Sequence, residues 1–303
     1  MSAQWETLWA GRAETAGLAS AQVKLARCLL ANRKITSEAA EAIHPESRPD
    51  RLFICEGLWA AEKLCQARIP VTHFLFSPEM AGALSPADRA QCACMLNYAA
   101  ETFIISKKAC EKISERDGAD FCFLIAELPE YTLQELETRL PEQTVIMVLD
   151  GQEQPGNIGA ILRSLDGAGG SFAVMTNRRV KPVHSRLIRS SLGAAFTHPL
   201  PEAPIEELLS WLKRWDFKVI LTDLTASVPY FQADYTGRIA IVAGNEYTGI
   251  SPIWRTLPNA VPVIIPMLGS CESLNVGFAS TLVAYEAGLR QKFGGKFERS
   301  QYI

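Results

Sequence analysis

The sequence of 303 residues predicts an α/β protein built from two units that follow each other along the chain. Short apolar runs alternate with segments of helical periodicity, which is the order expected when helices cover a sheet. A polar segment at residues 129–142, with a proline near each end, interrupts this alternation. The hydrophobic content of 48% is sufficient for a sizeable core, and the length favours two domains over one.

The first unit is expected to span residues 1–128 and to open with a helical extension over residues 18–32. Two further helices are expected at 58–66 and 86–96, and Ser85 offers the second of these a suitable N-cap oxygen. Short apolar segments with strand character lie at residues 51–55, 71–76, 102–105 and 121–125. The pattern therefore predicts a small sheet covered by helices.

Residues 129–142 are expected to form a linker, and residues 143–303 a second unit. The second unit opens with a continuous apolar run at 145–149, which is typical of a parallel strand buried on both faces. Further strands are expected at residues 171–175, 217–221, 239–242 and 261–265, with helices at 205–215 and 273–291. The order of strands and helices predicts a parallel sheet with helices on both faces.

The formal net charge of −3 argues against a protein that coats nucleic acid without specificity. One local stretch is nevertheless basic, and in the sequence only Asp166 opposes it. Two interpretations remain open, a site for RNA phosphates and an ordinary solvated surface. The basic residues are Arg163, Arg178, Arg179, Lys181, Arg186 and Arg189.

The eight cysteines are scattered through apolar segments, which is typical of buried thiols in a reducing compartment. Cys92 and Cys94 are close in sequence, but no second Cys or His pair stands at zinc-ligand spacing, so no metal site is expected. Residues 1–20 lack the pattern of a secretory signal, and no apolar run reaches about 18 residues. We therefore expect a cytoplasmic protein without membrane contact.

Three loops that follow predicted strands carry unusual residues, and ligands of open α/β sheets bind beyond the carboxyl ends of strands. Residues 150–163 contain Asn157 and Arg163 in the pattern Asn-x-Gly-x-x-x-Arg. Residues 242–251 contain Glu246 in Gly-x-Glu-x-x-Gly, and residues 264–279 contain Ile-Pro-Met-x-Gly-x-x-x-Ser-Leu-Asn-Val. Each loop alone has an ordinary explanation: a helix cap and a surface arginine, a turn, and a helix cap at Ser273.

Taken together and in this order, the three loops resemble the three motifs of the SpoU (TrmH) branch of the SPOUT RNA methyltransferases. The resemblance covers about residues 144–289 and includes the segment 189–194. A looser resemblance at residues 53–57 links the first unit to the substrate-binding domain of the family, which is similar to ribosomal protein L30e. One departure is Gly277, where family members often carry a serine.

The resemblance implies a C-terminal sheet with a deep trefoil knot and transfer of a methyl group from S-adenosyl-L-methionine to a ribose 2'-hydroxyl of RNA. The resemblance favours ribosomal RNA over transfer RNA as the expected substrate, because family members use the L30e-like domain on ribosomal targets. The resemblance also implies a homodimer, for which the helix at 273–291 is a candidate interface. Residues 1–128 would bind the RNA, and residues 143–303 would catalyse the transfer.

Carried over by position, the family's reacting site comprises Asn157, Arg163, Glu246, Ser273 and Asn275. Cofactor contacts would come from Gly244, Ile265, Met267, Gly269 and Leu274. The RNA phosphates would meet Arg178, Arg179, Lys181, Arg186 and Arg189.

A guanidinium stays protonated in proteins, so we assign Arg163 to phosphate anchoring and alkoxide stabilisation rather than to proton removal. Glu246 is expected to orient Asn157 or Arg163. The sulfonium already activates the methyl group, so no metal is needed. An alternative is an RNA-binding protein that has lost catalysis, whereas an NAD-dependent oxidoreductase is disfavoured because no GxGxxG follows the strand at 145–149.

Overall fold

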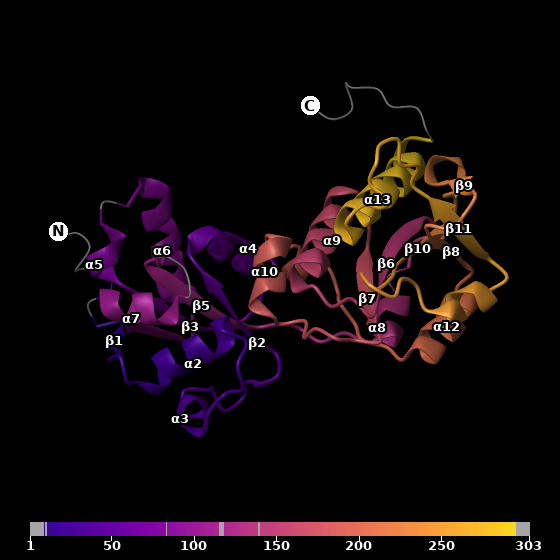
Figure 1. The fold of residues 1–303 in the computed structure, drawn as a ribbon. Helices are drawn as coiled ribbons and strands as arrows, with labels where there is room; N and C mark the ends of the chain where they lie inside the picture. Colours follow the sequence, from indigo (N-terminus) through magenta and orange to yellow (C-terminus); the bar gives the residue numbers. More distant parts are fainter. Residues whose placement is uncertain (1–8, 10, 83, 115–117, 139, 295–303) are drawn as a thin grey trace. The chain divides into compact units, whose positions relative to one another are not determined.

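The computed structural model describes residues 9, 11–82, 84–114, 118–138 and 140–294, and it divides into two compact units (Figure 1). The first unit comprises Met1–Pro129 and Pro182–Arg189, and the second comprises Glu130–Lys181 and Ser190–Ile303. Most of residues 1–10, on which the expectation about a secretory signal rests, lie outside the described residues.

The first unit is built on a mixed five-stranded sheet with the order β1-β4-β3-β5-β2. Strands β1, β4 and β3 run parallel, whereas β5 is antiparallel to both of its neighbours, β3 and β2. The four strands that the sequence predicts are all present. The strands are β1 (Glu14–Thr15), β2 (Leu52–Glu56), β3 (Val71–Phe76), β4 (Glu101–Ile104) and β5 (Cys122–Glu127).

Helices cover the first sheet, and three of them begin at serine caps, Ser20, Ser85 and Ser106. Ser20 Oγ accepts from the Val23 N–H at the start of α2, and Ser85 caps α6 as predicted. Leu25 of α2 is fully buried in a core cluster with Phe123 of the sheet. The helices are α2 (Ala21–Leu30), α3 (Ser37–Ala40), η1 (Leu58–Ala60), α4 (Ala61–Gln66), α5 (Pro78–Ala81), α6 (Pro86–Tyr98) and α7 (Lys107–Ile113).

The second unit contains a six-stranded sheet with the order β7-β6-β10-β8-β11-β9, in which every pairing is parallel. Strand β6, between β7 and β10, is buried at all seven positions, as the continuous apolar run predicts. Because all strands run the same way, their carboxyl ends meet at one edge. The strands are β6 (Thr144–Asp150), β7 (Phe172–Thr176), β8 (Phe217–Thr222), β9 (Val228–Pro229), β10 (Arg238–Ala243) and β11 (Ala260–Ile264).

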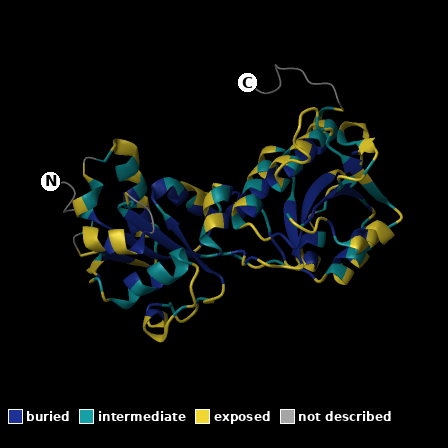
Figure 2. Ribbon diagram, in the orientation of Figure 1, coloured by how far each residue is buried: buried dark blue, intermediate teal, exposed yellow. Residues whose placement is uncertain are grey.

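Helices α9 and α13 pack together over one face of this sheet, and α8 and α12 lie over the other (Figure 1). Ile146 and Val148 of β6 are buried with Trp211 of α12, and Figure 2 shows the sheet between the two helical layers as buried. The predicted α/β fold with helices on both faces is confirmed. The helices are α8 (Leu133–Glu137), α9 (Pro155–Gly167), α11 (Ala194–Thr197), α12 (Ile205–Arg214), η2 (Tyr230–Gln232), η3 (Pro252–Thr256) and α13 (Val276–Phe293).

The segment expected to be a linker, residues 129–142, belongs largely to the second unit. A capping box between Thr132 and Glu135 starts α8 within it, and Leu133 and Leu136 are buried in the core of the second unit. Although this segment is polar overall, it contains a short helix whose two leucines are buried.

Residues 182–189 interrupt the second unit and contribute to the first, where they form most of α10 (Ser185–Ser191). Asn32 Nδ2 donates to Ser185 Oγ at 2.7 Å, and the Ser185 N–H donates to Asn32 Oδ1 at 2.8 Å. The chain therefore connects the two units at three points in the sequence. The trefoil knot stays a prediction from the family resemblance.

Candidate functional site

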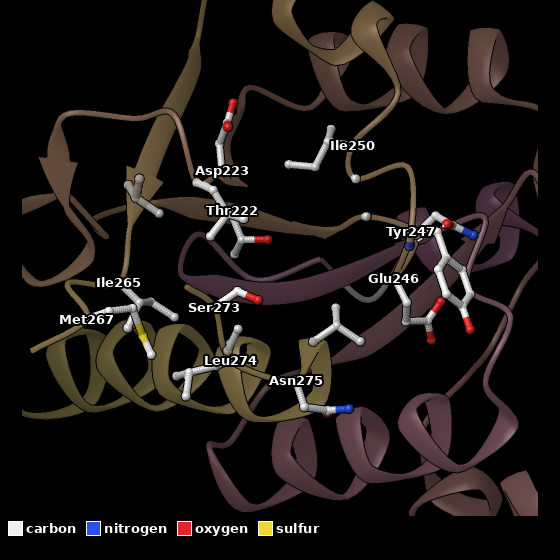
Figure 3. Close-up of a pocket in the computed structure, with 17 residues that line it drawn as sticks. Thr222, Asp223, Glu246, Tyr247, Ile250, Ile265, Met267, Ser273, Leu274 and Asn275 are labelled. Carbon is white, nitrogen blue, oxygen red and sulfur yellow. Dashed lines mark hydrogen bonds between the residues drawn. The ribbon is translucent and has the colours of Figure 1, made fainter. Parts of the chain in front are cut away.

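A cavity of about 420 Å³ opens at the carboxyl edge of the second sheet (Figure 3). Its walls come from the segments that follow β8, β10 and β11 and from the start of α13. In Figure 3, Ile265 and Met267 lie at one side of the pocket, whereas Glu246 and Tyr247 lie at the opposite side. The lining residues are Thr222, Asp223, Leu224, Gly244, Asn245, Glu246, Tyr247, Gly249, Ile250, Val263, Ile265, Met267, Ser273, Leu274, Asn275, Val276 and Ala279.

The turn after β10 is tightly closed and requires glycine at its first position. A Cβ on Gly244 would lie 2.4 Å from the carbonyl carbon of Gly249, a backbone atom that cannot swing aside. Asn245 and Gly249 exchange two backbone hydrogen bonds of 2.9 Å across the turn. The buried Gln152 side chain donates to the carbonyl oxygens of Ala243 and Gly244.

The carboxylate of Glu246 holds the amino-terminal end of α9. It accepts from the backbone N–H groups of Glu153 at 3.1 Å and Gln154 at 3.2 Å, and from Asn157 Nδ2 at 2.9 Å. A carboxylate is favoured at this end of a helix by its unpaired N–H groups and partial positive charge. The expectation that Glu246 orients Asn157 agrees with this geometry.

Asn275 joins the third loop to the other two. Its Nδ2 donates to Asn157 Oδ1 at 3.2 Å, and its Oδ1 accepts from the Gly277 N–H at 2.8 Å, which caps α13. The helix therefore begins after Asn275, and the alternative that Ser273 is its cap is wrong. Glu246, Asn157 and Asn275 form a continuous hydrogen-bonded chain, so the three motifs converge in space.

The departure at Gly277 has a steric consequence next to this chain. A Cβ at position 277 would lie 3.1 Å from Asn275 Oδ1, closer than nearly all Cβ contacts. The absence of a side chain therefore leaves the carboxamide of Asn275 free to adopt its capping position.

Most predicted site residues gather around the cavity. Glu246, Ser273 and Asn275 line it, as do four of the five predicted cofactor contacts: Gly244, Ile265, Met267 and Leu274. Asn157 lies one hydrogen bond behind them.

Besides Asn157, two residues predicted for the reacting site or for cofactor contact lie outside the lining, Gly269 and Arg163. Gly269 occupies an exposed part of the loop before α13. Arg163 is exposed on α9, and within the described residues its side chain forms no hydrogen bond or ion pair. The cavity of this single chain is therefore lined without the predicted arginine.

The prediction missed one wall of the cavity, formed by Thr222, Asp223 and Leu224. Asp223 Oδ1 accepts from the backbone and hydroxyl of Thr225, and its Oδ2 pairs with Arg255. Burial raises the pKa of Asp223, but the hydrogen bonds from Thr225 and Arg255 outweigh it and leave that pKa below its ordinary value. The sequence could have predicted this wall, because these residues directly follow the apolar run 217–221.

The structure divides the five predicted RNA-binding residues between the two units. Arg178, Arg179 and Lys181 belong to the second unit, whereas Arg186 and Arg189 belong to the first. Arg178 pairs with Glu202 at 2.5 Å, so Asp166 is not the only acidic residue that opposes the basic stretch. Arg178 and Arg179 line a further cavity of about 390 Å³, which shares Asn245 and Gly249 with the first cavity.

Over the ranges that the structure describes, no group of three or more His, Cys, Asp or Glu side chains has an arrangement that could hold a metal ion. In the same ranges, no helix is both long enough and apolar enough to span a bilayer.

Comparison with known proteins identifies this constellation. Residues 144–285 match the model of the SpoU rRNA methylase family. They form a SpoU methylase domain. The three hydrogen-bonded motif residues, Asn157, Glu246 and Asn275, all lie within it.

Relatives and solved structures agree with this assignment. A 23S rRNA (uridine(2479)-2'-O)-methyltransferase of Streptomyces viridochromogenes is 32% identical over 57% of this chain and 61% of its own length. The chain thus spans about three fifths of that relative. A crystal structure of an RNA 2'-O ribose methyltransferase has a TM-score of 0.73 and 29% identity, covering 92% of this chain and 98% of that one. The AdoMet-bound SpoU methyltransferase AviRb from S. viridochromogenes, 24% identical, shares the fold with a TM-score of 0.74 over 91% and 99% of the two chains.

Proposed function

We propose that this protein transfers a methyl group from S-adenosyl-L-methionine to a ribose 2'-hydroxyl of RNA, with ribosomal RNA as the substrate. The observation that carries this proposal is the hydrogen-bonded chain Glu246–Asn157–Asn275, which unites the three motifs beside one cavity. The printed names of a 23S rRNA relative and of an RNA 2'-O ribose methyltransferase structure support the same reaction.

The cavity is suited to this cofactor in size, lining and charge. Its volume of about 420 Å³ is in the usual range for small-molecule sites. Apolar side chains such as Ile265 and Leu274 can enclose an adenine ring, while backbone at Gly244 offers polar groups to its edges. Among the described residues, the ionisable carboxyl groups in its wall are Asp223 and Glu246, and no Lys, Arg or His lines it. This acidic lining favours a sulfonium cation over the diphosphate of NAD.

S-adenosyl-L-methionine would supply a methyl group already activated by the sulfonium charge. The chain's own contribution is orientation, because the methyl group must pass in line to the ribose oxygen. Asn157 is held by Glu246 and in turn holds Asn275, so the amide group of Asn275 is pre-positioned in the cavity wall. Ser273 adds a hydroxyl to the same wall.

Arg163 is assigned to the substrate rather than to the cofactor. Its exposed position on α9, outside the cavity lining, makes its guanidinium accessible to an RNA phosphate. From there it would anchor the phosphate beside the target ribose and stabilise the developing alkoxide.

A homodimer formed through α13 is part of the proposal. Phe278, Leu282, Tyr285 and Leu289 are 37–68% exposed and recur at helical spacing along this helix. Val283 and Ala287 of the same helix are buried in the subunit itself. The apolar stripe at 278, 282, 285 and 289 is the surface that a second copy would cover.

Sedimentation velocity tests the dimer with a double variant, Phe278→Glu and Leu282→Glu. We expect the wild type to sediment as a dimer and the variant as a monomer, because two charges would be buried in the interface. Leu268→Glu, at a loop residue that is 98% exposed, is the matched control and should remain dimeric. A monomeric wild type at micromolar concentration would contradict the dimer.

Methyl transfer itself is tested with radiolabelled cofactor and purified ribosomal and transfer RNA. We expect labelled 2'-O-methyl nucleotides in ribosomal RNA, and calorimetry should show binding of S-adenosyl-L-methionine but not of NAD. Binding of cofactor and RNA without transfer would favour the alternative of a catalytically inactive RNA-binding protein. Cytoplasmic location belongs to the same proposal, because ribosomal RNA and reduced thiols are found together there.

A further inference from the structure

Tyr247 is the most exposed aromatic side chain among the exposed large hydrophobics of the described residues, at 79%, and it stands at the cavity that holds the motif residues. Figure 3 shows its ring beside Glu246, on the side of the pocket away from Ile265 and Met267. This side also contains the hydrogen-bonded chain of motif residues. The ring is therefore exposed next to the groups assigned to the reaction, not next to those assigned to adenine.

The backbone under Tyr247 is held in a fixed position. Asn245 Oδ1 accepts from the N–H groups of Tyr247 at 2.9 Å and Thr248 at 3.0 Å. Asn245 Nδ2 donates to the Gly151 carbonyl oxygen at 2.8 Å, and this ties the turn to the loop after β6. An aromatic side chain on such a support loses little conformational entropy when a flat ligand covers it.

The other side of the same turn carries positive charge. The second cavity, about 390 Å³, shares Asn245 and Gly249 with the first and is lined by Arg178 and Arg179. Arg178 is engaged by Glu202, whereas Arg179 is exposed and, in the described ranges, has no side-chain partner. The turn at residues 245–249 thus has an exposed aromatic ring on one side and an available guanidinium on the other.

We propose that Tyr247 is a substrate-specificity residue, on which the base of an unpaired RNA nucleotide stacks while Arg179 binds a neighbouring phosphate. Single-stranded RNA is the class that this pairing recognises, because unstacked bases offer a π-face that a duplex conceals. The inference rests on the proposed methyl transfer and deepens it by naming how the substrate is held.

Steady-state kinetics on a single-stranded RNA substrate test the inference with three variants. Tyr247→Ala should raise KM for RNA by about 5- to 100-fold, in line with the loss of one stacked base. Tyr247→Phe keeps the ring and should remain within about threefold of wild type. Phe231→Ala removes an exposed aromatic side chain that does not line the cavity and should leave KM unchanged.

A cofactor readout separates recognition from structural damage. Calorimetric Kd for S-adenosyl-L-methionine should agree within about twofold among all variants, because Tyr247 lies at the side of the cavity opposite Ile265 and Met267, which are assigned to the cofactor. Arg179→Ala should weaken RNA binding and lower the slope of log Kd against log salt by about one.

Two results would overturn the inference: an unchanged KM for RNA in Tyr247→Ala, or an equal loss of RNA and cofactor binding in that variant. A lower KM for duplex RNA than for single-stranded RNA in the wild type would overturn it as well. A wild type that transfers no methyl group would instead count against the proposed function, so the two failures are distinguishable.

Discussion

The two units of this protein contain similar elements, but they differ in the direction of their strands. In the second unit every strand pairing is parallel, so β8, β10 and β11 all end at one edge. In the first unit β5 is antiparallel to β2 and β3, so its carboxyl end lies at the opposite edge from theirs. The loops that follow the strands therefore all meet at one edge in the second unit, whereas in the first unit the loop after β5 lies at the opposite edge from the loops after the other four strands.

The cavities of the two units reflect this difference. The cavity in the second unit is lined mainly by loops at strand ends, and three motif residues close a hydrogen-bonded chain beside it. A cavity of about 480 Å³ in the first unit is lined by α2, β2 and the segment 182–189, with Trp59 and Arg189 in its wall. In the second unit, the shared direction of the strands brings the motif loops to one edge of the sheet.

The largest expected effect comes from Arg163→Ala. If the second unit alone catalyses the transfer, removing this guanidinium should lower single-turnover methyl transfer by about 1000-fold, the upper range for loss of one charge-stabilising donor. The Kd for S-adenosyl-L-methionine should change little, because Arg163 lies outside the cavity lining.

Arg214→Ala is the matched control, since Arg214 is exposed on α12 over the other face of the same sheet and pairs with Glu137. It should retain wild-type transfer. Transfer by Arg163→Ala within a few-fold of wild type would mean that the site assignment is wrong.

A smaller effect is expected at the turn after β10. Gly244→Ala would force a Cβ to within 2.4 Å of Gly249 backbone, and overpacking of this kind costs about 1–3 kcal/mol. Calorimetry should therefore find cofactor affinity lowered by about 5- to 100-fold.

Gly156→Ala in α9 provides the comparison, because nothing lies within 4 Å of its added Cβ. This substitution should stabilise the protein by about 0.5–1 kcal/mol and leave cofactor affinity unchanged. Equal affinities for the two alanine variants would show that the closed turn is not part of the cofactor site.

Much of the second unit could be predicted because its signals are local. The run at 145–149 is apolar throughout, and β6 is buried on both faces. The motif spacings placed Glu246, Ser273 and Asn275 correctly at one cavity, because parallel strands bring their following loops together.

Features that depend on tertiary contacts were beyond the sequence. Asn275 rather than Ser273 caps α13, and the capping carboxamide also donates to Asn157, 118 positions earlier in the chain. The assignment of residues 182–189 to the first unit rests on Asn32, which periodicity treats as the end of a helix. Asp223 was missed although its position after a strand followed the same rule that located Glu246.

The smallest expected effect is confined to the first unit and concerns His73 of β3, which is 1% exposed. Burial lowers its pKa below 6.5, although Glu101, with its carboxylate 3.6 Å from Nε2, opposes the shift. The unfolded chain then takes up a proton near pH 6.5 that the folded unit does not. Stability from this histidine is therefore fully present above that pH and is lost as the pH falls below it, by about 1.4 kcal/mol for each unit by which its pKa is lowered.

Hydrogen exchange in urea should show the unfolding midpoint of β3 peptides falling between pH 7.5 and 5.5. His73→Phe should reduce that fall, while β6 peptides of the second unit should be unaffected by the substitution. A β3 midpoint that stays constant in the wild type would contradict the prediction, and a β6 midpoint that follows β3 in His73→Phe would mean that the two units do not unfold independently.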